Sequence, residues 1–191
     1  MRICLLSYRG NPYCGGQGVY LYYLSKALAN RGHQITILVG PPYPLEMSWA
    51  EVVRFPNHNF INKLGKSAIP KEKPFSVFKP FDFAELFLSR LGNNPEPFFF
   101  SLRAYQWLRQ KALEGKKFDI VHDNQSLGYG LLLIKQLGVP VLSTVHHPLQ
   151  IDRKEDLKQM QGFIARAKRS LYYPLVMQKI VAKRLNRIIT V

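Results

Sequence analysis

Short apolar runs alternate with amphipathic stretches along most of this chain. The apolar runs predict strands at 2–8, 33–39, 51–55, 118–122, 139–145 and 186–191. The amphipathic stretches predict helices at 18–31, near 98–114 and near 127–137. Strands that alternate with helices of this length form right-handed βαβ units and a parallel sheet. We therefore predict an α/β fold: a Rossmann-like, doubly wound, mainly parallel sheet with helices on both faces.

Glycines mark the ends of the predicted helices. One follows each helix, shortly before the next strand, at Gly32, Gly115 and Gly138. Glycine adopts the left-handed conformation that ends many helices. Within the first helix, leucines recur at spacings of three and four, at Leu21, Leu24 and Leu28. This spacing predicts one stripe that faces the core.

Two segments interrupt the alternation. Residues 57–98 form an insertion that is too long for an ordinary connection and rich in phenylalanine. It either buries its phenylalanines or presents an apolar surface to an acceptor or a membrane, beside Lys63, Lys66, Lys71 and Lys73. Residues 152–187 form a basic helical stretch broken by Pro174. Its charged face is either solvated or attracted to anionic lipid headgroups.

The basic stretch has two predicted faces. Its charged face carries Lys179, Lys183, Arg184 and Arg187. Its apolar face carries Val176, Ile180 and Leu185. The two sets of residues lie largely on opposite sides of the predicted helix.

A short glycine loop, Cys14-Gly15-Gly16-Gln17-Gly18, joins the first strand to the first helix. Glycine has no Cβ, so peptide N–H groups in such a loop can approach a ligand closely. The helix that follows adds unpaired N–H donors and the positive end of its dipole. The loop is thus either a cradle for an anionic group or a tight turn that binds nothing.

Histidines lie at the carboxyl ends of two of the predicted strands. His122 ends one strand and is followed by Asp123 and Asn124, whereas His146 and His147 follow the next. Ligands of open parallel sheets bind at the carboxyl ends of the strands. The three histidines should therefore converge with the glycine loop at one edge. Together with Asp123 they could also bind zinc or manganese, although the sequence does not fix their spacing in space.

The sequence motifs of other common nucleotide-binding and catalytic sites match this chain poorly. A dinucleotide site needs a third glycine where this chain has Leu21, and an acidic residue at the end of the second strand, where it has Val39-Gly40. Gly65-Lys66-Ser67 has the last letters of a phosphate-binding Walker loop but lacks its first glycine and a preceding strand. No Gly-x-Ser-x-Gly motif predicts a nucleophilic serine.

The composition of the chain restricts the classes of binding partner that it favours. The chain has 191 residues, 27 basic against 12 acidic, and a net charge of +15. This charge favours nucleotide, phospholipid or nucleic acid, and no recognised nucleic-acid motif accompanies it. Two cysteines, Cys4 and Cys14, predict a reducing, cytoplasmic compartment. No apolar run is long enough for a spanning helix, so membrane contact would be peripheral, on the inner face.

Several segments together resemble the start of a group 1 (family 4) glycosyltransferase of the GT-B fold. They are Arg2 to Ser7, Gly15-Gly16 opening a helix, the run Leu28-x-x-Arg31-Gly32-His33-x-Ile35, the strands at 118–122 and 140–146, and 187–191. The resemblance implies a retaining glycosyltransferase that moves a sugar from a nucleotide-diphosphate donor to an acceptor. It implies that residues 1–191 form the acceptor-side N-terminal domain, which would be inactive without the donor-binding domain and its Glu-x7-Glu motif. No metal or other cofactor is implied.

The resemblance also assigns roles to residues. Gly15 and Gly16 match the loop whose amides approach the donor diphosphate, and His146 matches the catalytic-site histidine that contacts the transferred sugar. His122, Asn124 and His147 are substrate-binding candidates. Asn124 stands where the family often has a second histidine, and His147 where it often has an acidic or small residue.

Two other functions remain open from the sequence. One is a non-catalytic Rossmann-like module that binds a partner. The other is a sugar-nucleotide epimerase of GT-B shape. The basic charge and the phenylalanines of 57–98 would suit an anionic, lipid-linked or membrane-surface acceptor.

Overall fold

A computed structural model describes residues 1–14, 16–56, 79–90, 94–147, 149–159, 162–163, 166, 174–185 and 187–191. The chain divides into two compact units. Unit 1 comprises Met1–Asn57, Pro97–His147 and Val176–Val191. Unit 2 comprises His58–Glu96 and Pro148–Leu175.

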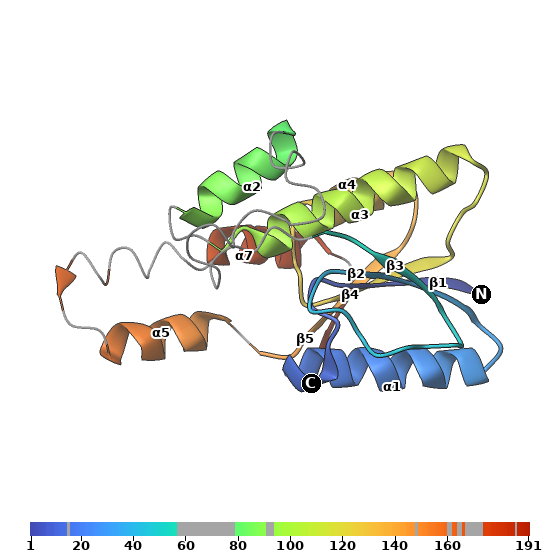
Figure 1. The fold of residues 1–191 in the computed structure, drawn as a ribbon, viewed down its shortest axis with the longest axis horizontal. Coiled ribbons are helices and arrows are strands. Elements are labelled where there is room, and N and C mark those ends of the chain that lie inside the picture. Colours follow the sequence, from blue (N-terminus) through green and yellow to red (C-terminus); the bar gives the residue numbers. More distant parts are fainter. Residues whose placement is uncertain are drawn as a thin grey trace. The chain divides into compact units, whose positions relative to one another are not determined.

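Unit 1 contains a six-stranded parallel sheet with the strand order β3-β2-β1-β4-β5-β6 (Figure 1). The strands are β1 (Arg2–Ser7), β2 (Gln34–Val39), β3 (Glu51–Arg54), β4 (Ile120–Asn124), β5 (Val141–Val145) and β6 (Arg187–Thr190). The predicted doubly wound fold is confirmed, and every predicted strand forms. The strand order reverses between β1 and β4, which is where such sheets bind ligands.

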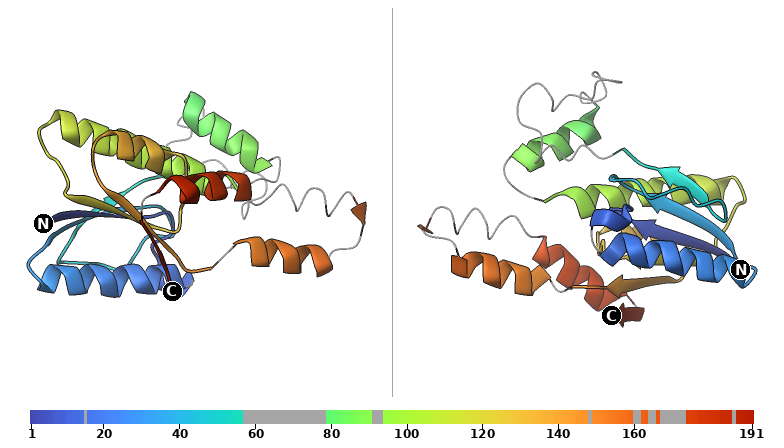
Figure 2. Two further views of the ribbon diagram at one scale, coloured as in Figure 1. Left: turned by 180° about the vertical axis from the view of Figure 1, so that it is seen from behind. Right: turned by 60° about the horizontal axis from the view of Figure 1, so that its bottom comes forward.

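Helices cover both faces of this sheet (Figure 2). One face carries α1 (Gly16–Asn30), and the other carries α3 (Glu96–Leu113), α4 (Gly130–Gln136) and α7 (Leu175–Arg184). Successive side chains of a strand point to opposite faces, so β1 serves both cores. Leu5 packs with Leu21 of α1, whereas Leu6 packs with Leu131 of α4. Burying each leucine stabilises the fold by about 2 kcal/mol.

The predicted glycine stops are confirmed. Gly32, Gly115 and Gly138 all adopt positive φ, at 81°, 76° and 78°. After α3, the Gly115 amide donates to the Ala112 carbonyl and the Lys116 amide donates to the Lys111 carbonyl. These bonds satisfy carbonyls at the helix end that have no partner within the helix.

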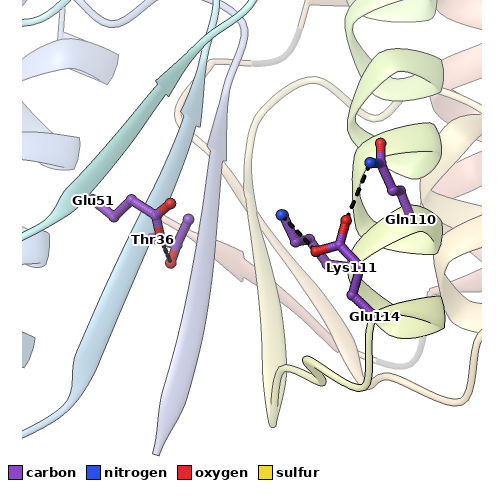
Figure 3. Close-up of polar contacts among 5 residues, drawn as sticks. All are labelled: Thr36, Glu51, Gln110, Lys111 and Glu114. Atoms are coloured by element: carbon purple, nitrogen blue, oxygen red, sulfur yellow. Dashed lines mark hydrogen bonds and ion pairs between the residues drawn. The ribbon is translucent and has the colours of Figure 1, made fainter.

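The two edges of the sheet differ. At one edge, Thr36 of β2 donates its hydroxyl to Glu51 of β3 at 3.2 Å (Figure 3). At the other edge, all four residues of β6 are exposed, including Ile188 and Ile189.

The last helix of unit 1 buries only part of the apolar set opposite its basic residues. In α7, Met177 and Val181 are buried, whereas Val176 is 73% exposed. Leu185, just after the helix, is buried, and Lys179, Lys183, Arg184 and Arg187 are exposed. Apolar residues occupy adjacent stripes of this helix, so its sequence alone does not select the buried stripe.

Unit 2 contains α2 (Pro80–Arg90) and α5 (Leu149–Gln159). On α2, Phe83 and Phe87 stack with ring centroids 6.5 Å apart, and each is 54% exposed. Glu85 and Ser89 of the same helix are buried. The helix therefore presents an aromatic pair to solvent.

Several predicted features lie outside the described residues. They are the phenylalanines at 60, 75 and 78 and the lysines at 63, 66, 71 and 73. Among the helices that the structure describes, none combines the length and apolar character needed to cross a membrane.

Candidate functional site

The candidate site lies at the carboxyl ends of β1, β4 and β5 in unit 1. Ser7 ends β1, Asn124 ends β4, and His146 follows the last residue of β5. The sheet register pairs Asn124 with Thr144 of β5. These residues therefore meet at the reversal of strand order, as the topology predicts.

The start of α1 is held against the preceding loop by a glycine. A Cβ at Gly18 would lie 2.2 Å from the Asn11 carbonyl oxygen and 2.6 Å from the Pro12 nitrogen. A Cβ at Gly16 would meet nothing within 4 Å. Gly18 is thus required by packing, whereas Gly16 borders open space at the helix start. Gly15, the other predicted cradle residue, lies outside the described residues.

Asn124 connects three parts of the site. Its amide nitrogen donates to the Ser7 hydroxyl at 3.2 Å and to the Gln17 backbone carbonyl at 2.9 Å. Its amide oxygen lies 2.5 Å from Nε2 of His146. One buried side chain thus links β1, the first turn of α1 and the end of β5.

His146 is half-buried and contacts an aromatic side chain. The ring of Tyr20, from α1, packs edge-on against its imidazole, with centroids 4.8 Å apart and an angle of 75° between the planes. Burial lowers the pKa of His146 below its ordinary value. The imidazole is therefore neutral at physiological pH and can act as both a hydrogen-bond donor and an acceptor.

Gln125 holds the backbone that carries His146. Its side-chain oxygen accepts from the backbone amides of His146 at 2.8 Å and His147 at 3.2 Å. Its side-chain nitrogen donates to the His147 carbonyl at 2.7 Å. Gln125 is buried and has a φ of 63°, which is uncommon for a residue other than glycine. Sequence reasoning missed this residue, because no motif marks it.

His122 lies beneath the site, within β4. Its Nε2 is 2.7 Å from the Thr144 hydroxyl, which is also 3.2 Å from the hydroxyl of Tyr20. Burial and the neighbouring His146 lower the pKa of His122 to about 4. His122 therefore supports Thr144 and Tyr20 as a neutral, buried side chain, and it belongs to the layer below His146.

The low pKa of His122 predicts acid sensitivity. The unfolded chain, with a histidine pKa near 6.5, binds a proton that the folded chain excludes until about pH 4. The contribution to stability is therefore complete above pH 6.5 and falls by about 1.4 kcal/mol per pH unit below it. We expect the unfolding free energy of His122→Gln to decline less steeply than that of the wild type between these pH values. Denaturant titrations over that range measure this difference, and parallel declines would contradict it.

Asp123 has a structural role in the turn that follows β4. Its carboxylate is fully buried and accepts from the Ser126 amide and hydroxyl, the Leu127 amide at 3.1 Å and the Ser143 hydroxyl at 2.7 Å. These bonds fix the turn that follows β4. Among the described residues, no group of three or more histidine, cysteine or acidic side chains is placed to hold a metal ion.

The predicted residues thus occupy different positions. The structure brings Asn124 into contact with His146 and with the first turn of α1, next to Gly16. His122 lies deeper, and the side chain of His147 is exposed while its backbone is held by Gln125. Two side chains of the site were not predicted from the sequence. Gln125 belongs to no motif, and Tyr20 has no feature that distinguishes it from other positions of the first helix.

Comparisons with known proteins place the chain in one family. The model for Glycosyltransferase Family 4 matches residues 14–191. An MMP alpha-(1->4)-mannosyltransferase from Mycolicibacterium hassiacum is 38% identical over all of this chain, which spans 46% of that relative's length. A crystal structure of O-ureido-L-serine synthase aligns with 99% of this chain. The alignment covers 57% of the synthase chain, and the two sequences are 15% identical. The TM-score of this alignment is 0.28.

Proposed function

Because the chain belongs to glycosyltransferase family 4, we propose that it forms the acceptor-side half of a retaining glycosyltransferase. The donor is a nucleotide-diphosphate sugar, and the remainder of the full-length protein supplies the donor-binding domain. One observation carries this proposal. Asn124 joins the first turn of α1 to His146 at the reversal of strand order, where α/β sheets bind their ligands.

The donor diphosphate is proposed to lie at the start of α1. Gly16 borders open space there, and the first turn of α1 contains no acidic residue. Backbone amides and the helix dipole at such a position attract phosphate groups. They would stabilise the negative charge that develops on the leaving nucleotide.

The transferred sugar is proposed to contact His146. This side chain is half-buried and is held by Asn124 and Tyr20. His147 is exposed beside it and is the second candidate for contact with substrate. The relative named above is a mannosyltransferase, so mannose is the first sugar to test.

Substitution of Gly16 tests the donor site. We expect Gly16→Val to lower kcat/KM for the donor about tenfold in the full-length protein, because the added carbons occupy the space proposed for the diphosphate. Its melting temperature should be nearly unchanged, since a Cβ there meets nothing within 4 Å. Gly18→Ala is the matched control, because its Cβ would meet backbone atoms at 2.2 Å and should lower the melting temperature. Unaltered donor kinetics of Gly16→Val would argue against the cradle.

The acceptor is proposed to be anionic, either lipid-linked or at the inner surface of the cytoplasmic membrane. The net charge of +15 favours an anionic surface, and the exposed Phe83 and Phe87 of unit 2 offer aromatic side chains to a lipid surface. We expect the full-length protein to float with anionic liposomes more than with neutral ones. The double variant Phe83→Ser, Phe87→Ser should float less. Equal flotation with both lipids would remove the electrostatic part of this proposal.

A screen of nucleotide sugars tests the function itself. The full-length protein is incubated with each donor, and release of the nucleoside diphosphate is measured with and without candidate acceptors. We expect slow hydrolysis of one donor that an acceptor accelerates. Epimerisation of a donor without any acceptor, or no turnover of any donor, would contradict the proposal.

A further inference from the structure

We infer that Asn124 is a positioning residue that fixes the tautomer of His146, with the proton on Nε2 and the lone pair on Nδ1. His146 then meets its substrate as a hydrogen-bond acceptor, and its partner is a hydroxyl group of a sugar. This inference rests on the proposed function, because it specifies what His146 does there.

The orientation of the Asn124 amide is fixed by its contact with the backbone of Gln17. The Gln17 carbonyl lies 2.9 Å from the amide nitrogen of Asn124. A backbone carbonyl can only accept a hydrogen bond, so an NH₂ group must face it. The reversed amide would place two oxygen acceptors against each other, and Asn124 is too buried for water to relieve that contact.

The tautomer of His146 follows from this orientation. The amide oxygen of Asn124 then faces Nε2 of His146 at 2.5 Å. An amide oxygen only accepts, so Nε2 carries the proton and donates. In a neutral imidazole the other nitrogen, Nδ1, keeps its lone pair. Among the described residues, none donates a hydrogen bond to it.

The surroundings keep the ring neutral and in place. Tyr20 packs on its side from α1, His122 approaches from β4, and His147 follows it in the chain. Burial lowers the pKa of His146, and the positive charge that it would gain on protonation also opposes protonation of His122. Gln125 fixes the backbone at the same point.

The consequence is a choice between ligand groups. A lone pair at Nδ1 accepts from a hydroxyl but repels the oxygen of an ionised phosphate, which has no proton to give. The diphosphate therefore lies at the start of α1, and a sugar hydroxyl lies at His146.

The tautomer can be measured directly on the full-length protein. Nitrogen-15 NMR of the labelled histidine rings at pH 7.5 distinguishes a protonated from an unprotonated ring nitrogen, and His146→Gln assigns the signal. We expect Nδ1 of His146 to be unprotonated and Nε2 to be protonated, with a mixed population in Asn124→Ala. A protonated Nδ1 in the wild type would overturn the inference, without any measurement of activity.

Kinetics of Asn124→Asp in the full-length protein provide the second test. The carboxylate keeps an acceptor facing Nε2 but adds a negative charge, which favours the imidazolium form and removes the lone pair from Nδ1. We expect the acid limb of the kcat/KM profile to move at least one pH unit towards alkaline pH. Asn124→Ala should lose about tenfold in kcat without that shift.

The proposed role of His146 and the positioning role of Asn124 can fail separately. If His146→Ala keeps wild-type turnover, the proposed role of His146 fails, whatever the NMR result. If His146→Ala is inactive but the profile of Asn124→Asp is unshifted, only the inference on Asn124 fails. Should Asn124→Asp not fold, the wild-type ring signals alone decide.

Discussion

Replacing His146 with alanine in the full-length protein should reduce kcat/KM for sugar transfer about a hundredfold, which corresponds to the loss of one positioned polar contact in a transition state. The side chain is half-buried, held at Nε2 by Asn124 and packed against Tyr20. Its geometry is therefore fixed before substrate arrives, and little reorganisation is needed during the reaction. Initial rates at varied donor and acceptor concentrations measure the loss.

A second histidine provides the control. His33 lies just before β2, at the opposite end of the strands from the site, where Nδ1 is 3.5 Å from the N-terminal amine. We expect His33→Ala to keep wild-type kinetics. Near wild-type turnover of His146→Ala would show that another residue contacts the sugar. Equal losses in both variants would point to a general loss of folded protein.

Replacing Asp123 with alanine should lower the unfolding free energy by about 4 kcal/mol. The variant leaves the buried donors of Ser126, Leu127 and Ser143 without their acceptor. Burial raises the pKa of Asp123, whereas these donors lower it. Burial is the larger of the two effects, so the pKa of Asp123 stays above its ordinary value and the bonds offset only part of the cost of burying the carboxyl group. Denaturant unfolding of the 191-residue chain measures the change.

The matched control is an exposed carboxylate. Glu114, in the turn directly after α3, pairs with Lys111 at 2.8 Å and accepts from Gln110 at 3.1 Å at the surface (Figure 3). Exposed ion pairs contribute little to stability, so Glu114→Ala should unfold at the same denaturant concentration as the wild type. An Asp123→Ala variant as stable as this control would show that water replaces the lost carboxylate.

The fold was predictable because its signals are local. Apolar runs, the leucine stripe and the three glycine stops each depend on neighbouring residues, and all of them formed as predicted. The face of α7 was not predictable in the same way. Val176 and Met177 are both apolar, and the choice between them depends on contact with other parts of the chain.

The candidate site was predictable only to the edge of the sheet. Topology placed His146, Asn124 and the glycine loop at the same carboxyl ends. It did not reveal which side chain joins them, since the direction of a side chain at a strand end depends on the turn that follows. The positive φ of Gln125 and the hydrogen bonds of Asp123 determine that turn here. Neither a glutamine nor an aspartate at these positions is, by its residue type alone, a signal for such a role.

The exposed strand β6 has a practical consequence for production of the chain. Among the strands that the structure describes, none pairs with the outer side of β6, whose backbone donors and acceptors lie next to Ile188 and Ile189. Such a margin is a template on which another polypeptide can pair. Purified samples at high concentration should therefore be checked for self-association before kinetics are interpreted. The variant Ile189→Lys would place a charge on the exposed strand and oppose such pairing.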